Sequence, residues 1–134
     1  MQGSCLCGSI VYQADSLDTP IRHCGCSTCR KAHAAAFNSG CGVKKAHFRW
    51  LQGESLLAQY ESSPGKIRYF CSRCGTQLVA EKVGVPYMVL RVATLDEDPG
   101  VRPSAHIWTS HEVPWLAYGG ALPRCDEWPP GYPG

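Results

Sequence analysis

The sequence predicts a mainly β fold with one short helix, and two observations carry this prediction. Short segments rich in β-branched and aromatic residues recur along the 134-residue chain, and 14 glycines and 10 prolines are spread between them. Such segments are typical of short strands separated by turns. Only residues 27–36 are instead rich in alanine and basic side chains. Because 44% of the residues are hydrophobic and 18% are charged, the composition is that of a globular chain, and we expect a single domain over residues 1–134.

The expected strands follow one another along most of the chain. Residues 87–92, Tyr-Met-Val-Leu-Arg-Val, give the strongest strand signal, and residues 96–103 are a charged, proline-bearing loop. Three prolines in residues 127–134 exclude a helix there, so we expect the tail from about residue 125 to be extended or mobile. The strands are expected at residues 9–13, 20–23, 37–43, 47–51, 56–60, 66–70, 77–81, 87–94 and 105–109.

The helix is expected at residues 27–36. Ser27 or Thr28 can cap its N-terminus, because a short hydroxyl side chain accepts a hydrogen bond from the first free backbone N–H groups. Arg30, Lys31 and four alanines favour helical backbone over the rest of the segment.

Nine cysteines point to metal or thiol chemistry rather than to disulfides. The first residues lack the basic end and apolar stretch of a signal peptide, and no apolar run approaches the roughly 20 residues that span a bilayer. We therefore expect a cytoplasmic protein with no membrane partner. In a reducing compartment clustered cysteines are typical of metal ligands or catalytic thiols, and the odd number argues against a simple disulfide framework.

Seven of the nine cysteines fall in three clusters. Cys71 and Cys74 form C-x-x-C followed by Gly75, the pattern of a zinc knuckle, in which a tight turn presents two thiolates to one metal. A structural zinc takes four ligands, and Cys5 and Cys7 can supply the missing pair. The sequence thus predicts one closed four-thiolate zinc site that fastens the N-terminus to the middle of the chain.

The remaining cluster, Cys24, Cys26 and Cys29, offers three thiolates and leaves a fourth position open, as in catalytic zinc sites. Three thiolates largely neutralise Zn²⁺, so such a site is better suited to holding an incoming thiol as a thiolate nucleophile than to making hydroxide. The alternatives are an empty site, a disulfide within the cluster or a purely structural metal. Open three-thiolate sites lose metal and oxidise readily, so this second zinc is expected to be labile.

The net charge argues against a nucleic-acid partner. It is formally +2, and seven thiolates around two Zn²⁺ would bring it to about −1. Binding to phosphate backbones relies on a clear excess of positive charge, which this chain lacks.

A few further residues are candidates for substrate contacts. Arg30 and Lys31 follow the open cluster and can meet substrate carboxylates, or they simply form a solvated helix face. His33 lies four residues after Cys29 and, like His23, is a candidate fourth ligand or a group that orients one, although a structural role is the plainer alternative. His33 is also the candidate proton-transfer group. We expect Trp108 and Trp115 in the core, and the two lone cysteines as small packed side chains. These two are Cys41 and Cys125.

The three clusters in this order and spacing closely resemble the glutathione-dependent formaldehyde-activating enzyme family, which also includes centromere protein V. The resemblance rests on Gly-Ser-Cys-Leu-Cys-Gly at residues 3–8, His-Cys-Gly-Cys-Ser-Thr-Cys-Arg-Lys at residues 23–31 and Phe-Cys-Ser-Arg-Cys-Gly-Thr at residues 70–76. His106 belongs to a later segment, His-Ile-Trp-Thr-Ser, that is also similar to the family, so it is a further candidate pocket residue. The similarity extends over roughly residues 3–124.

The resemblance implies a fold, two metals and an activity. It implies a β-tent of stacked antiparallel sheets and carbon–sulfur lyase-type chemistry, in which glutathione and formaldehyde form S-hydroxymethylglutathione or such an adduct is cleaved. The alternatives are a non-catalytic zinc module that binds protein or nucleic acid, and an enzyme of the same fold that acts on another thiol or thioether. Neither the true substrate nor the oligomeric state follows from the sequence. The implied ligands are Cys5, Cys7, Cys71 and Cys74 for a structural zinc and Cys24, Cys26 and Cys29 for a catalytic zinc.

Overall fold

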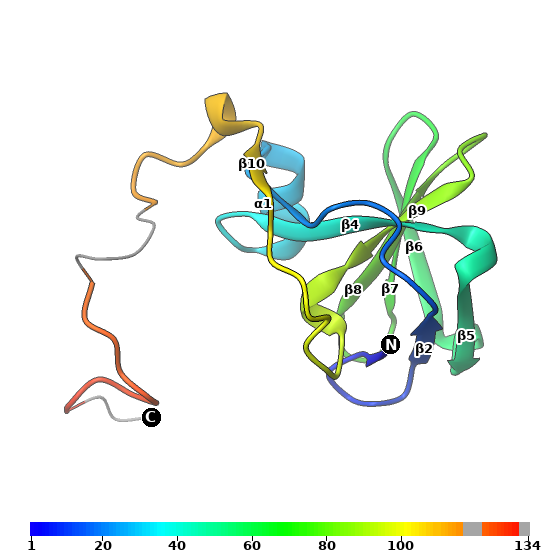
Figure 1. The fold of residues 1–134 in the computed structure, drawn as a ribbon, viewed down its shortest axis with the longest axis horizontal. Coiled ribbons are helices and arrows are strands. Elements are labelled where there is room, and N and C mark those ends of the chain that lie inside the picture. The colour runs from blue at the N-terminus through cyan, green and yellow to red at the C-terminus, as the bar shows by residue number, and fades with distance from the viewer. Residues whose placement is uncertain (117–121, 132–134) are drawn as a thin grey trace.

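The structure is a computed structural model that describes residues 1–116 and 122–131. It contains two β-sheets and one α-helix, so the predicted mainly β fold with a single short helix is confirmed (Figure 1). Figure 1 shows helix α1 and strand β10 at one end of the long strand β4, with β2 and β5 at the other end. No helix among the described residues is long and apolar enough to cross a membrane.

The smaller sheet has three antiparallel strands in the order β1-β2-β5. The strand β1, which the sequence pattern did not predict, pairs Gly3 with Tyr12 of β2. A glycine is required here, because a Cβ at position 3 would lie 2.2 Å from the Tyr12 ring. The strands are β1 (Gln2–Ser4), β2 (Val11–Ala14) and β5 (Phe48–Gln52).

The larger sheet has seven strands in the order β10-β3-β4-β9-β8-β7-β6. All its pairings are antiparallel except β10 with β3, which run parallel and place Ile107 opposite Cys24. Short 3₁₀ turns at Lys45–His47, Glu54–Leu56, Val92–Thr94 and Thr109–His111 connect or extend the strands. The strands are β3 (Arg22–Cys24), β4 (Asn38–Lys44), β6 (Leu57–Ser63), β7 (Lys66–Cys71), β8 (Gln77–Lys82), β9 (Tyr87–Arg91) and β10 (Ala105–Ile107).

Side chains from both sheets form one hydrophobic core. Tyr12 is fully buried and its ring stacks on Phe48, with 5.2 Å between the ring centroids. Leu78 and Leu90 of the larger sheet are likewise fully buried in the same cluster. Cys41 also belongs to this core, as predicted.

Three sequence predictions about individual side chains are wrong. Trp108 is 57% exposed and Trp115 is 71% exposed, so neither indole belongs to the core. Cys125 is exposed rather than packed. These residues follow β9, beyond the part of the chain that contributes buried strands, and nothing in the local sequence reports that change.

The helix α1 (Ser27–His33) is shorter than predicted and begins differently. Its N-cap is Cys26, whose side chain accepts a hydrogen bond from the Cys29 N–H, and not Ser27 or Thr28. It ends early because Ala34 adopts left-handed backbone with φ of 47°, so Ala35 and Ala36 do not extend it. The thiol therefore takes the capping role that the hydroxyl residues were expected to play.

Most of the expected strands begin or end one to three residues away from the predicted positions. The strand expected at residues 87–94 ends at Arg91, where a 3₁₀ turn begins, and the strand expected at residues 105–109 ends at Ile107. Within residues 122–131 the chain makes turns and bends without helix or strand. The end of the predicted tail, residues 132–134, lies outside the described residues.

Candidate metal centres

Four cysteines from two distant parts of the chain meet at one point. The Sγ atoms of Cys5, Cys7, Cys71 and Cys74 all lie within 4.8 Å of one another. The Sγ atom of Cys7 lies 3.5 Å from that of Cys5 and 3.9 Å from that of Cys71. A tetrahedron with metal–sulfur bonds of about 2.3 Å has edges of about 3.8 Å, so this set has the dimensions of a four-thiolate metal site.

Two glycine-containing turns present these thiols. Gly8 and Gly75 have φ of +71° and +75°, and their N–H groups donate to the carbonyls of Cys5 and Cys71 at 2.8 Å each. In both turns the backbone reverses immediately after a cysteine pair. The positive φ that this reversal needs is rarely adopted by residues other than glycine. The Ile10 N–H donates to the Cys5 Sγ atom at 3.3 Å, which helps to fix the position of this sulfur.

Thr76 joins the two turns. Its hydroxyl lies 3.3 Å from the Cys74 Sγ atom and accepts a hydrogen bond from the Leu6 N–H at 3.1 Å. The hydrogen bond from this hydroxyl lowers the pKa of Cys74 to about 5, whereas burial raises the pKa of Cys71 to about 11. The contacts of Thr76 thus favour the thiolate form of Cys74, which is the form that binds a metal.

The second cluster lies at the junction of β3 and α1. Cys24 ends β3, Cys26 caps the helix and Cys29 lies in its first turn, and their Sγ atoms are within 4.8 Å of one another. Among the described residues no histidine or carboxylate completes the set, so three thiolates face one open position. The Arg30 Nε atom donates to the Gly25 carbonyl at 3.1 Å and holds the turn between Cys24 and Cys26.

Hydrogen bonding and burial act differently on these thiols. Burial raises the pKa of Cys24 to about 12. Burial also opposes ionisation of Cys26, but hydrogen bonds from the Cys29 N–H and neighbouring groups outweigh it and lower the Cys26 pKa. The capping thiol therefore ionises more readily than Cys24.

A pocket of about 250 Å³ opens beside Cys24 and Cys29. Arg68 of β7 and Arg91 of β9 line it, and they are only 6% and 4% exposed. The Arg68 Nη2 atom lies 4.0 Å from the Cys29 Sγ atom, and its Nε atom donates to the Ser62 hydroxyl at 2.9 Å. Sequence reasoning missed both arginines, because they stand alone in strand segments and only the sheet brings them together.

The four predicted substrate residues occupy four different positions. Lys31 lines an open groove of about 650 Å³ together with Arg68. His33 shares a cavity of about 510 Å³ with Arg91, and burial, reinforced by the nearby Arg91 and Arg68 charges, lowers its pKa to about 4. Lys31 and His33 therefore line different cavities, and neither lines the pocket beside Cys24 and Cys29.

The other two predicted residues are less directed at the cluster. Arg30 is engaged with the Gly25 carbonyl, as described above. His106 pairs with His23 across β10 and β3, with 5.1 Å between the ring centroids. The His23 Nδ1 atom lies 2.9 Å from the Ser39 hydroxyl. Neither imidazole belongs to the three-thiolate set.

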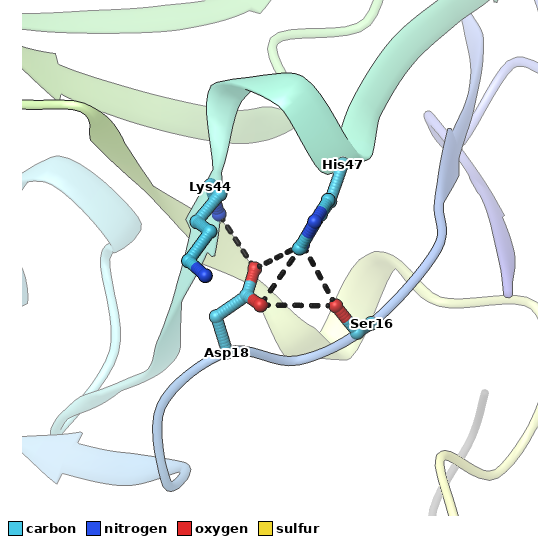
Figure 2. Close-up of polar contacts among 4 residues, drawn as sticks. All are labelled: Ser16, Asp18, Lys44 and His47. Atoms are coloured by element: carbon cyan, nitrogen blue, oxygen red, sulfur yellow. Dashed lines mark hydrogen bonds and ion pairs between the residues drawn. The ribbon is translucent and has the colours of Figure 1, made fainter.

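A serine, a histidine and an aspartate also meet away from both clusters (Figure 2). The Ser16 hydroxyl lies 3.0 Å and the nearer Asp18 oxygen 2.9 Å from the same atom, Nδ1 of His47. In a catalytic triad the serine and the aspartate bind different ring nitrogens of the histidine, so these three residues do not form one. Asp18 also accepts a hydrogen bond from the Lys44 N–H at 2.7 Å, so the group fastens the loop before β3 to the turn after β4.

Together, the fold and the two thiolate clusters define a mainly β protein with one closed and one open cysteine site, each of which could hold a metal ion. The chain belongs to the glutathione-dependent formaldehyde-activating enzyme family, whose model matches residues 1–111. This confirms the resemblance carried by the cysteine motifs.

One solved structure with a similar fold is the crystal structure of a Rhodobacter sphaeroides protein from the Northeast Structural Genomics programme. It is 23% identical, superimposes with a TM-score of 0.64, and the match covers 79% of this chain and 99% of that one. At this identity the likeness supports the fold alone. No curated protein is significantly similar to this chain.

Proposed function

We propose that this chain is a zinc-dependent enzyme of carbon–sulfur chemistry that joins glutathione to formaldehyde or cleaves the resulting adduct. The observation that carries the proposal is the open set of Cys24, Cys26 and Cys29 in a chain of this family. In the forward direction a C–S bond forms, the carbonyl π bond of formaldehyde is lost, and the thiol proton ends on the new hydroxyl. The reverse direction makes this a carbon–sulfur lyase.

The donor set fits zinc at both clusters. Thiolate sulfur is a preferred zinc ligand, and four sulfurs make a closed structural site whereas three leave a position for an exogenous ligand. When bound there, zinc supplies a positive centre that keeps an incoming thiol ionised. We therefore assign Cys5, Cys7, Cys71 and Cys74 to a structural zinc. The three-thiolate set of Cys24, Cys26 and Cys29 is assigned to the catalytic zinc.

The chain's own residues prepare the second site in two ways. The helix N-terminus and its N–H groups favour negative charge on Cys26, which caps it. The Arg68 guanidinium next to Cys29 offsets part of the thiolate charge. A less negative ligand set repels an arriving thiolate less, which favours binding of the thiol in its reactive form.

The free state of all nine cysteines suits a reducing compartment, and it supports a cytoplasmic location. In such a compartment glutathione is abundant as a thiol, which is the form the reaction requires.

The direct test mixes protein, glutathione and formaldehyde and follows adduct formation by exchange NMR. We expect about two zinc ions per wild-type chain and a rate above the uncatalysed reaction. Cys24→Ser should lose the second zinc and the acceleration, whereas Cys125→Ser, at an exposed cysteine outside both clusters, should retain both. A wild-type rate no faster than buffer would reject formaldehyde as the carbonyl substrate.

A further inference from the structure

The pocket beside the second cluster carries a concentration of positive charge. Four basic side chains line it, and no aspartate or glutamate does so among the described residues. Glu112 comes close to Gly25, where a Cβ would lie 3.0 Å from its Cγ atom, but it does not line the pocket. The basic residues are Arg22, Lys66, Arg68 and Arg91.

Two of these cations are buried with part of their hydrogen-bonding capacity unused. Within residues 1–116 and 122–131, the Nη1 atom of Arg68 and the Nε and Nη2 atoms of Arg91 have no hydrogen-bond partner. Leaving charged donors buried and unpaired is costly, and buried guanidinium groups are usually paired with an anion. These N–H groups therefore suit an acceptor that the folded chain does not itself supply.

The thiolates do not account for this charge. Three thiolates and one Zn²⁺ together carry one net negative charge, whereas the four basic side chains carry four positive charges. The positive charges repel one another: burial, and then the repulsion of Arg91 and Arg68, lower the pKa of Lys66. Even with a thiolate bound as fourth ligand, the region keeps an excess of positive charge.

The size of the pocket limits what the anion can be. At about 250 Å³ it is smaller than the roughly 300–1,000 Å³ typical of sites for drug-sized ligands. Glycines line it where β4 passes, and a Cβ at Gly42 would lie 2.8 Å from Thr19. A planar group with two oxygens matches the donor fork of a guanidinium. The pocket thus suits a carboxylate on a short carbon chain.

We propose that Arg68 and Arg91 bind the carboxylate of a small substrate acid and so direct its reacting group toward Cys24 and Cys29. The reacting group rests on the proposed function, whereas the carboxylate site itself does not. Two sources are compatible with the chemistry: the thiol substrate can carry the carboxylate, or a carbonyl substrate other than formaldehyde can carry it. Since Arg68 also lines the open groove, the remainder of a larger thiol has a place to lie.

The first experiment needs no variant. Calorimetric titration of the zinc-loaded protein with propionate is compared with titration by propionamide, which has nearly the same shape without the charge. We expect propionate to bind at least about tenfold more tightly. Hydrogen bonds to charged groups contribute more to binding than neutral ones, and the difference corresponds to roughly a tenfold change in affinity. Equal binding of the two ligands would overturn the proposal.

Variants then locate the binding. Arg91→Gln should abolish the preference for propionate over propionamide, and Arg68→Gln should weaken it. Arg49→Gln removes a guanidinium that pairs with Asp15 on the smaller sheet, away from the pocket, and should leave the preference unchanged. Circular dichroism and zinc content verify that each variant is folded and loaded. A preference that survives in folded Arg91→Gln would place the anion elsewhere and contradict the inference.

Competition with glutathione distinguishes the two sources. If a glutathione carboxylate occupies the pocket, saturating glutathione excludes propionate. If the pocket receives the carboxylate of a carbonyl substrate other than formaldehyde, propionate binds alongside glutathione. Either result supports the carboxylate site, whether or not glutathione and formaldehyde react faster in the NMR assay, so failure of the proposed function and failure of this inference give different outcomes.

Discussion

Removing the cysteine pair at the end of β7 should destabilise the whole protein. In the variant Cys71→Ser/Cys74→Ser the four-thiolate set loses half its ligands, and the smaller sheet is no longer fastened to the larger sheet through this site. Cys7 and Cys71 are 64 positions apart, so the metal closes a long loop in the unfolded chain. The chain-entropy relation for a cross-link over such a loop gives about 4 kcal/mol.

This loss should be large enough to measure by thermal unfolding. For a domain of this size 1 kcal/mol corresponds to about 3–5 °C, so we expect the melting temperature of the variant to fall by roughly 12–20 °C. Circular dichroism follows the transition and atomic absorption counts the zinc. Chelation of the wild-type protein with EDTA should produce a similar shift without any substitution.

The control is Cys125→Ser, which removes an exposed thiol outside both clusters and should melt like the wild type. The reasoning is refuted if the double variant loses one zinc per chain and still melts within about 3 °C of the wild type. In that case the cluster would hold metal without linking the sheets energetically.

Three smaller perturbations test other parts of the fold. Gly3→Ala places a Cβ 2.2 Å from the Tyr12 ring, and we expect it to lower the free energy of unfolding by about 2 kcal/mol in urea titration; no change would contradict the close packing of β1. His33 has a folded-state pKa of about 4 against 6.5 unfolded, so stability should fall by roughly 1–2 kcal/mol as the pH drops over this range, and His33→Gln should flatten that dependence. The Lys44 N–H lowers the pKa of Asp18, so its contribution is present at neutral pH and is lost as the pH falls below about 4; Asp18→Asn should lack this acid-side loss in pH-dependent melting.

Local patterns were sufficient to predict most strands and both cysteine clusters. The motif containing Cys71 and Cys74 predicts its own turn, because glycine at position 75 allows the positive φ that the turn needs. Strand segments such as Lys66–Cys71 are recognisable because their β-branched and aromatic residues are bounded by turn residues. Pairing Cys5 and Cys7 with the later knuckle required only the ligand count of zinc.

Tertiary contacts explain what the sequence did not reveal. The strand Gln2–Ser4 is defined by the fit of Gly3 against Tyr12, which no local pattern reports. Arg68 and Arg91 lie in β7 and β9, which flank the same strand, β8, and only this arrangement of the sheet brings them to one pocket. The helix start depends on a thiol as cap, whereas propensity rules favour the hydroxyl residues that follow it.

The capping role of Cys26 connects metal supply to the shape of the groove. An isolated helix of seven residues is not stable in water, and here its N-terminal cap and Cys29 are both candidate zinc ligands. Since Ser27, Thr28 and Lys31 line the open groove, loss of zinc from the second cluster would loosen one wall of it. The population of molecules with a formed groove would then follow the free zinc concentration, so that a zinc buffer would adjust the amount of competent protein without any change in its expression.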